Sequence, residues 1–414
     1  MREPHSSFGS QAPKREVETA VMFRRLFKNW KAALAALAVV ATGSAAAALA
    51  YAPYLPRLAF EGYPAETWPA SGSFVRVAGA PRAPTIHDWG EAKRRLNTEA
   101  KRRFEGKEGR ALLVYSGGRL ELEHYGEGIG PGSMLNSYSM TKSLIGALVL
   151  RALADGRIAS LQDPIGHYLP RLGDAEFRAL PISAFLRMES GVVFEPAGGI
   201  SAIGGSAKDI EGTRLNPFGP MARLHMQGLE TVAGDLRTRT SLRGRYDYQN
   251  VNTAILGRLL AEAYCQPLEE ILSEQIWAPA GAESAIWRRY ASGKPVSPYC
   301  CLYATPRDWL VVGRFLINNG TTKRQFLPEN LWRRFFGLDL TYEQIRRGRY
   351  GLHIYQDVLD RKGEKLQGPF SFMLGSRGQI VYMMPERDLV VVRFGGKIPL
   401  LHTTLYGAWR SISD

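Results

Sequence analysis

The stretch Ser137-Tyr-Ser-Met-Thr-Lys-Ser143 contains a Ser-x-x-Lys motif and is followed by an apolar run over residues 144–154. The run predicts a buried helix, because nearly all of its residues are apolar. If Ser139 opens this helix, Lys142 lies one turn later on the same face and can reach the serine hydroxyl. The helix N-terminus adds unpaired N–H groups and a positive dipole end, which suit an oxyanion. One turn is therefore predicted to hold a nucleophile, its base and one oxyanion donor.

A plainer interpretation of the same motif is a serine N-cap beside an exposed lysine, because Ser-x-x-Lys is short and common by chance. The context favours the catalytic interpretation. The preceding stretch Gly130-Pro-Gly-Ser-Met-Leu-Asn136 is typical of a loop. A lysine one turn inside an apolar helix also needs a partner or a chemical role, because burying its charge is costly.

A second motif, Tyr248-Gln-Asn250, stands just before the amphipathic helix predicted over 250–264. A phenol beside a buried ammonium is expected to have a lowered pKa, because the opposite charge favours the phenolate. Tyr248 is therefore predicted to shuttle protons between the nucleophile and the leaving group. The alternative is a tyrosine that simply packs at a helix start.

The fold class predicted from the pattern is α/β (α+β), with an antiparallel sheet flanked by helices and a mainly helical subdomain at about 144–280. Strand patterns occur at both ends of the globular part and helical patterns between them, so the two ends are expected to share one sheet. The predicted strands are 111–115, 119–125, 350–355, 371–374, 379–384 and 389–394.

The N-terminal region carries a basic cluster and then an uncharged apolar run over 32–52, just long enough to span a bilayer. Residues 1–31 are predicted to stay cytoplasmic, because positive charge remains on that side. The run is either an uncleaved transmembrane signal anchor, which we favour, or a cleaved signal peptide. Residues 53–86 are predicted to form a linker, and 87–414 the globular domain. The domain is thus expected on the periplasmic side of a bacterial inner membrane, or free in the periplasm after cleavage.

Composition and residue spacing bear on nucleic-acid binding, metal sites and disulfides. The 414-residue chain has a formal charge of +14, but the arginines are scattered and no nucleic-acid-binding motif is visible. The histidines and cysteines show no ligand spacing, so no metal site is predicted. The three cysteines are Cys265, Cys300 and Cys301. At most one disulfide, from Cys265 to the neighbouring pair, is expected, with buried free thiols as the favoured alternative.

The ordered motifs resemble the serine hydrolases of the penicillin-recognising fold, which include class C β-lactamases, D-alanyl-D-alanine carboxypeptidases, related esterases and 6-aminohexanoate-dimer hydrolases. Ser139-Met-Thr-Lys142 matches their nucleophile motif and Tyr248-Gln-Asn250 their second motif. The stretch 248–257 is most similar to the 6-aminohexanoate-dimer hydrolase branch, and the resemblance spans about residues 85–414. Further matching segments are Leu153-Ala-Asp-Gly-Arg-Ile158, Asp163-Pro-Ile165, Tyr168-Leu-Pro170, Met188-Glu-Ser-Gly191 and Ala304-Thr-Pro-Arg-Asp-Trp309.

The third motif departs from the family pattern of Lys/His, Thr/Ser and Gly. Gly378 is kept, but Ser376 stands where the basic residue is usual, and Arg377 would point to the other face of a strand. The basic group that would hold a substrate carboxylate is thus missing from its place. Gly378 fits a close backbone approach, and the Gln379 N–H is the expected second oxyanion donor.

The resemblance implies a β-lactamase/transpeptidase-like fold and a cofactor-free serine hydrolase that cleaves amide or ester bonds of small molecules through an acyl-enzyme. Ser139, Lys142 and Tyr248 are the expected catalytic residues, and Asn250 is expected to orient the Lys142–Tyr248 pair or the substrate. The alternatives are a cell-wall D-Ala-D-Ala carboxypeptidase and a catalytically silent, membrane-tethered binding domain. The expected partners are a small amide or ester substrate and the membrane, through the N-terminal segment, but no nucleic acid. No oligomeric state is predicted.

Overall fold

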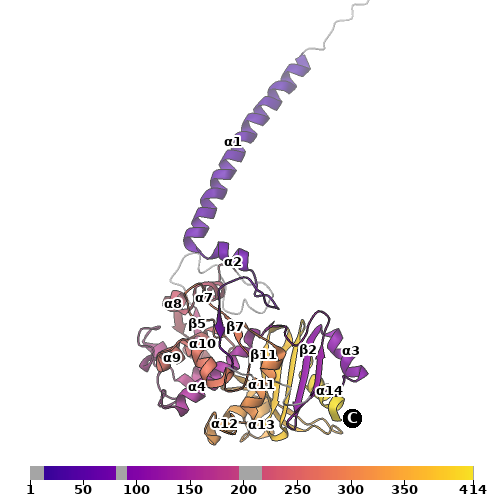
Figure 1. The fold of residues 1–414 in the computed structure, drawn as a ribbon. Coiled ribbons are helices and arrows are strands. Elements are labelled where there is room, and N and C mark those ends of the chain that lie inside the picture. Colours follow the sequence, from indigo (N-terminus) through magenta and orange to yellow (C-terminus); the bar gives the residue numbers. More distant parts are fainter. Residues whose placement is uncertain (1–13, 81–90, 195–216, 414) are drawn as a thin grey trace, which may run out of the picture. The chain divides into compact units, whose positions relative to one another are not determined.

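The computed structural model describes residues 14–80, 91–194 and 217–413. The chain divides into two compact units, Met1–Pro56 and Arg57–Asp414. The first unit contains the long helix α1 (Lys14–Tyr51), seen at the top of Figure 1. Its segment Trp30–Ala50 is long and apolar enough to cross a membrane. A signal sequence would have the same length and composition, so both interpretations of the predicted run 32–52 stand.

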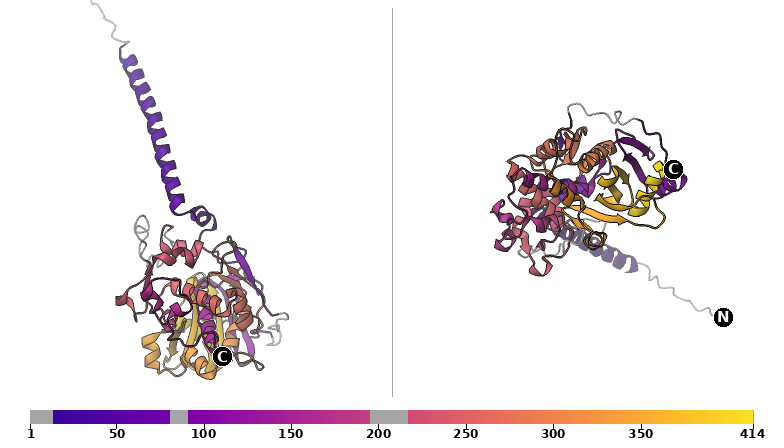
Figure 2. Two further views of the ribbon diagram at one scale, coloured as in Figure 1. Left: turned by 90° about the vertical axis from the view of Figure 1, so that its left-hand side faces the viewer. Right: turned by 90° about the horizontal axis from the view of Figure 1, so that it is seen from below.

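The second unit is built around a seven-stranded antiparallel sheet with the order β3-β2-β13-β12-β11-β10-β9. Strands from the two ends of the unit meet in its middle, where β2 pairs with β13. Figures 1 and 2 show this as purple strands beside yellow ones. The strands are β2 (Gly109–Ser116), β3 (Arg119–Tyr125), β9 (Tyr350–Gly351), β10 (Ile354–Leu359), β11 (Gly368–Gly375), β12 (Gln379–Met384) and β13 (Leu389–Gly395).

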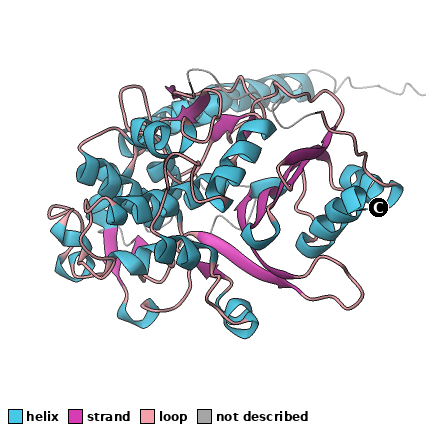
Figure 3. Ribbon diagram, turned by 60° about the horizontal axis from the view of Figure 1, so that its bottom comes forward, coloured by secondary structure: helices cyan, strands magenta, loops and turns pink. Residues whose placement is uncertain are grey.

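Successive side chains of a strand point to opposite faces, and residues are buried at most positions of β2 and at every position of β13, so both faces of the sheet are buried. On β2, Leu113 and Tyr115 belong to the large core that also contains α11 (Pro306–Ile317). Leu112 and Val114 point the other way, into a second core with α3 (Thr98–Gly106) and α14 (Leu401–Ser413). Helices therefore cover the sheet on both sides, as Figure 3 shows.

A mainly helical part fills the chain between the two groups of strands. Its centre is α4 (Thr141–Ala154), in which nearly every residue is buried, packed against α9 (Asn250–Tyr264). The predicted fold class, an antiparallel sheet flanked by helices with a helical part inserted, is confirmed. The other helices of the unit are α5 (Ala175–Arg178), α6 (Ile182–Leu186), α7 (Pro220–Gln227), α8 (Leu229–Val232), α10 (Leu268–Leu272), α12 (Glu329–Phe336) and α13 (Tyr342–Gly348).

The segment after α1 differs from the linker predicted over 53–86. Its described part belongs to the second unit from Arg57 onward and includes the end of α2 (Leu55–Glu61). Strand β1 (Phe74–Val77) pairs with β7 (Ala285–Arg288), in a small sheet that continues through β8 (Leu302–Ala304) to β4 (Leu135–Asn136). Residues 81–90, where the predicted linker ends and the predicted domain begins, lie outside the described residues.

A buried ion pair fixes the start of this segment. Glu61 Oε2 lies 2.8 Å from Arg288 Nη2, and the two side chains are only 7% and 3% exposed. Arg288 Nη1 also donates to the His225 carbonyl at 2.9 Å. Such a pair orders the backbone on both sides, because neither charge can be left buried alone.

Glu61→Ala is therefore expected to lower the free energy of unfolding by about 3–5 kcal/mol, because Arg288 would stay buried without its carboxylate. The matched control is Glu343→Ala, which removes an ion pair with Arg347 whose side chains are 73% and 79% exposed. That change should cost no more than about 1 kcal/mol. Urea unfolding followed by tryptophan fluorescence measures both. Equal effects of the two substitutions would contradict the structural role of the buried pair.

Candidate active site

Ser139 lies in a short 3₁₀ turn, Tyr138–Met140, that runs directly into α4. Tyr138 holds a positive φ of 45°, which is uncommon for a residue with a side chain. Two hydrogen bonds hold it there. Its N–H donates to Asn136 Oδ1 at 2.8 Å, and its carbonyl accepts from Thr141 Oγ1 at 3.1 Å. The turn thus presents Ser139 just ahead of the helix, as the Ser-x-x-Lys spacing predicts.

Lys142 is buried in the first turn of α4, with 2% of its surface exposed. Its Nζ lies 2.9 Å from Ser139 Oγ and 2.9 Å from the carbonyl oxygen of Tyr299. Burial lowers the pKa of Lys142 well below its ordinary value, because the charged form loses its hydration. The lowered pKa makes the neutral amine easier to form than in an exposed lysine, and the nitrogen stands within proton-transfer distance of the serine hydroxyl.

One prediction for Tyr248, a lowered pKa of its phenol, is wrong. Its pKa is raised, not lowered, because loss of water around the phenol outweighs a hydrogen bond with Ser139 that acts in the opposite direction, although 36% of the residue's surface stays exposed. Lys142 Nζ lies over the Tyr248 ring, 5.0 Å from its centroid, so the lysine nitrogen faces the π-system of the ring. The Tyr248 hydroxyl is thus a protonated group beside Ser139.

A cavity of about 1290 Å³ opens onto these groups. Ser139, Tyr248 and Asn250 all line it, so the two motifs come together although 109 residues separate Ser139 from Tyr248. Lys142 does not line the cavity and is reached through the serine hydroxyl. Asn250 is the first residue of α9, on the same wall as Tyr248. The structure therefore brings together four of the six predicted site residues.

The other two, Gly378 and Gln379, lie beside the cavity but do not line it. Gly378 has a φ of +83°, in the turn that separates β11 from β12. Gln379 is fully buried, and its side-chain Nε2 donates to the Gly395 carbonyl at 3.1 Å. Ser376 lines the cavity instead. Ser376 directly follows Gly375, the last residue of β11, which approaches the Ser137 carbonyl closely.

Arg377 lies in the same turn and not on a strand face. It has a φ of +65°, and its guanidinium lies 3.5 Å from Glu66 Oε2. The arginine thus neutralises a carboxylate of the segment that follows α2. It does not replace the basic residue that is missing from the third motif.

Gly375 brings the end of β11 against the nucleophile turn. A Cβ at this position would collide with the Ser137 carbonyl oxygen. Gly375→Ala is therefore expected to push β11 away from the turn and to reduce kcat by about 100-fold, because misplacement by about 1 Å costs that much. Gly351→Ala is the control, since nothing lies within 4 Å of its added Cβ. Circular dichroism should find both variants folded, and an unchanged kcat in Gly375→Ala would contradict the close approach.

The cysteines differ both from the favoured expectation of buried free thiols and from a disulfide between Cys265 and one of the neighbouring pair. Cys300 and Cys301 are joined in a disulfide although they are neighbours in the sequence, and Cys265 is free and exposed. Cys300 lines the cavity. The pair follows Tyr299, whose backbone carbonyl contacts Lys142. Sequence reasoning missed Tyr299, because a main-chain contact leaves no side-chain signature.

Among the residues that the structure describes, no group of His, Cys, Asp and Glu side chains could hold a metal ion.

A serine and a buried lysine at the start of a helix, between an antiparallel sheet and a helical part, define the class of serine hydrolases that react through an acyl-enzyme. Within that class the chain belongs to the beta-lactamase family, because the sequence pattern of that family matches residues 97–395. The resemblance drawn from the motifs is thereby confirmed. The match begins at 97, so the segment from Arg57 to β1 lies outside the family domain.

Individual relatives agree with this assignment. The chain is 26% identical over 218 residues to the 6-aminohexanoate-dimer hydrolase of Paenarthrobacter ureafaciens, a match that covers 51% of the chain and 52% of that relative. The chain thus spans about half the length of this curated relative.

Solved structures with the same fold include two hydrolases. A protein from Bacillus anthracis described as a 6-aminohexanoate-dimer hydrolase has a TM-score of 0.63 at 19% identity, over 82% of this chain and 90% of that one. A D-stereospecific amidohydrolase from Streptomyces has a TM-score of 0.54 at 14% identity, over 75% of this chain and 97% of that one.

Proposed function

We propose that the chain is a serine amidase or esterase that acts on small amides or esters through a covalent acyl-enzyme at Ser139. The observation that carries the proposal is the 2.9 Å distance between Lys142 Nζ and Ser139 Oγ, at a lysine whose burial favours the neutral amine. A neutral amine at that distance can take the hydroxyl proton as the oxygen attacks.

The proposed sequence of steps uses only side chains and main-chain groups of this site. Ser139 Oγ attacks the substrate carbonyl carbon while its proton passes to Lys142 Nζ. The tetrahedral oxyanion is held by the N–H groups of Ser139 and Ser376. The C–N or C–O bond then breaks, and the leaving group takes a proton through Tyr248. Water, deprotonated by the same pair, attacks the ester and releases the acid and Ser139.

Amide and neutral ester substrates are favoured over peptides with a free carboxylate. Ser376 occupies the place of the family's basic residue, and Arg377 is paired with Glu66. A D-Ala-D-Ala carboxypeptidase therefore remains the second candidate within the enzyme class. A catalytically silent binding domain fits less well, because it would have no use for a buried lysine aimed at a serine.

The proposal includes a location. The apolar segment Trp30–Ala50 would anchor the chain in a bacterial inner membrane with the hydrolase in the periplasm, or would direct its release there after cleavage. This rests on length, composition and the basic cluster before the segment.

The test is labelling and turnover with the full chain in detergent. A fluorescent alkyl phosphonate should modify the wild type and not Ser139→Ala, and mass spectrometry should place the adduct on Ser139. Turnover is then compared for p-nitrophenyl esters, aminohexanoate dimers, nitrocefin and D-Ala-D-Ala peptides. Labelling that persists in Ser139→Ala would reject the serine assignment. Preferred turnover of the peptides would select the carboxypeptidase, and neither labelling nor turnover would support the silent domain.

A further inference from the structure

Residues 57–66 precede the family domain, yet they reach the active-site cavity. Four of them, Leu58, Gly62, Tyr63 and Pro64, line it together with Ser139. We propose that this segment, called here the substrate wall, binds the acyl group of the substrate and selects esters and amides with an extended apolar chain. The inference rests on the proposed function and names its substrate class.

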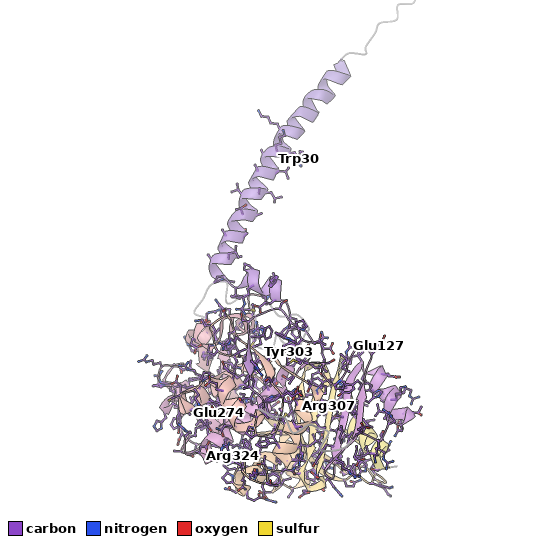
Figure 4. The ribbon with its side chains drawn as sticks, viewed as in Figure 1. Trp30, Glu127, Glu274, Tyr303, Arg307 and Arg324 are labelled. Carbon is purple, nitrogen blue, oxygen red and sulfur yellow. A yellow bond between two sulfur atoms is a disulfide. The ribbon has the colours of Figure 1, made fainter. Side chains whose placement is uncertain are left out.

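The substrate wall is held to the nucleophile turn by its backbone. The Pro64 carbonyl accepts from the Tyr138 hydroxyl at 3.3 Å, one residue before Ser139. The Ala65 carbonyl accepts from Asn136 Nδ2 at 2.9 Å and from the Tyr303 hydroxyl at 2.8 Å. Tyr303 is labelled in Figure 4, near the top of the globular unit. These contacts couple the position of the wall to the turn that carries the nucleophile.

The N-terminal end of the substrate wall is also held in place. The buried Glu61–Arg288 pair holds it, and Arg57 Nη1 donates to the Met226 carbonyl at 2.9 Å. Between these two anchored ends, the Tyr63 ring stacks on that of Tyr138, with 6.0 Å between centroids. Tyr63 nevertheless keeps 55% of its surface exposed. A rigidly mounted aromatic ring that remains open to a cavity is suited to contact a ligand, because little further ordering is needed on binding.

The chemistry of the cavity indicates what the wall would bind. Apolar side chains face the cavity from other elements as well, including Phe194, Met221 and Leu242. Its volume of about 1290 Å³ is larger than the reacting carbonyl and leaving group alone would need. Arg239, Arg245 and Asp247 also line the cavity and contribute two positive charges and one negative charge. An apolar acyl chain that extends from Ser139 along Tyr63 fits the apolar side chains and the volume of the cavity.

The experiment measures kcat/KM of the full chain for p-nitrophenyl acetate, butyrate, hexanoate and octanoate. For the wild type, kcat/KM should rise at least tenfold from acetate to hexanoate, because each buried methylene adds binding energy. Tyr63→Ala and Leu58→Ala should each remove most of that rise, so that kcat/KM falls several-fold more for octanoate than for acetate. Tyr63→Phe should retain the rise. The control is Tyr342→Ala, which removes a ring of α13 that is 45% exposed and lies outside the cavity lining.

The outcomes separate the two proposals. If the preference for longer acyl chains survives in both Tyr63→Ala and Leu58→Ala, or if kcat/KM falls by the same factor for every ester, the proposed role of the substrate wall is wrong. The serine mechanism would be unaffected by either result. Phosphonate labelling of Ser139 gives a second measurement, in which an octyl phosphonate should lose reactivity towards Tyr63→Ala and a methyl phosphonate should not. If the wild type shows no Ser139-dependent turnover or labelling at all, the proposed function fails and the wall fails with it.

Discussion

Replacing Lys142 by methionine is expected to reduce kcat by about 100- to 10,000-fold, the range that a positioned general base contributes. Methionine has nearly the same volume, so α4 should keep its packing, but it cannot accept a proton from Ser139. The turn that holds Ser139 is also fixed through Tyr138 and Thr141 and does not depend on the lysine. Thermal unfolding should therefore change little, while single-turnover acylation by a p-nitrophenyl ester becomes very slow.

The control is Lys323→Met, at an exposed position in the connection after α11, where kcat should stay within twofold of the wild type. The pH profile gives a second, independent measurement. A base acts only in its deprotonated form, so wild-type kcat/KM should rise with pH as Lys142 loses its proton. Because burial lowers its pKa, that rise should lie well below the ordinary lysine value of 10.5. A rise centred near 10.5, or a Lys142→Met variant that keeps a tenth of kcat, would contradict the role of the lysine as base.

The pairing of Ser139 with Lys142 could be predicted from the sequence because it is local. Helical periodicity alone puts residue i+3 on the same face, and an apolar run ensures that the lysine is buried. Strands β2 and β13 could be predicted for a similar reason, since their short, nearly continuous apolar runs are typical of strands with both faces buried. Neither inference required knowledge of how distant segments meet.

The remaining features depend on contacts between segments that are far apart in the sequence, and residue patterns do not predict such contacts. How far the Tyr248 hydroxyl is removed from water depends on how distant segments pack around it, and this loss of water gave the pKa shift its sign. The contact from the Tyr299 carbonyl to Lys142 is made by main chain, so residue type gives no signal. The position of residues 57–66 beside Ser139 depends on the Glu61–Arg288 pair, whose members are 227 residues apart. A Pro- and Gly-rich stretch of this kind is typical of a linker until such a pair is seen.

Tyr248→Phe is expected to lower kcat by about 100-fold, because it removes the hydroxyl that passes a proton to the leaving group. The substitution keeps the ring that lies 5.0 Å from Lys142 Nζ, so the environment of the lysine is preserved. The loss should be greatest for amides, whose leaving nitrogen needs a proton, and smaller for p-nitrophenyl esters, whose leaving group departs as a stable anion. Comparing kcat for an anilide and a p-nitrophenyl ester of the same acid measures this difference directly.

The pH dependence tests which protonation state of Tyr248 is active. Burial raises its pKa, so the hydroxyl should stay protonated throughout the neutral range, and activity that depends on it should fall only above the ordinary tyrosine value of 10.0. A lowered pKa would instead make activity depend on a phenolate, and kcat would rise with pH through a Tyr248-dependent step near neutrality. Tyr246→Phe is the matched control, because Tyr246 lines the same cavity two residues earlier, with its ring 5.3 Å from that of Tyr350. If both phenylalanine variants lost the same activity, or if Tyr248→Phe lost none, the hydroxyl of Tyr248 would have no special part in proton transfer, and Lys142 alone would have to supply the leaving-group proton.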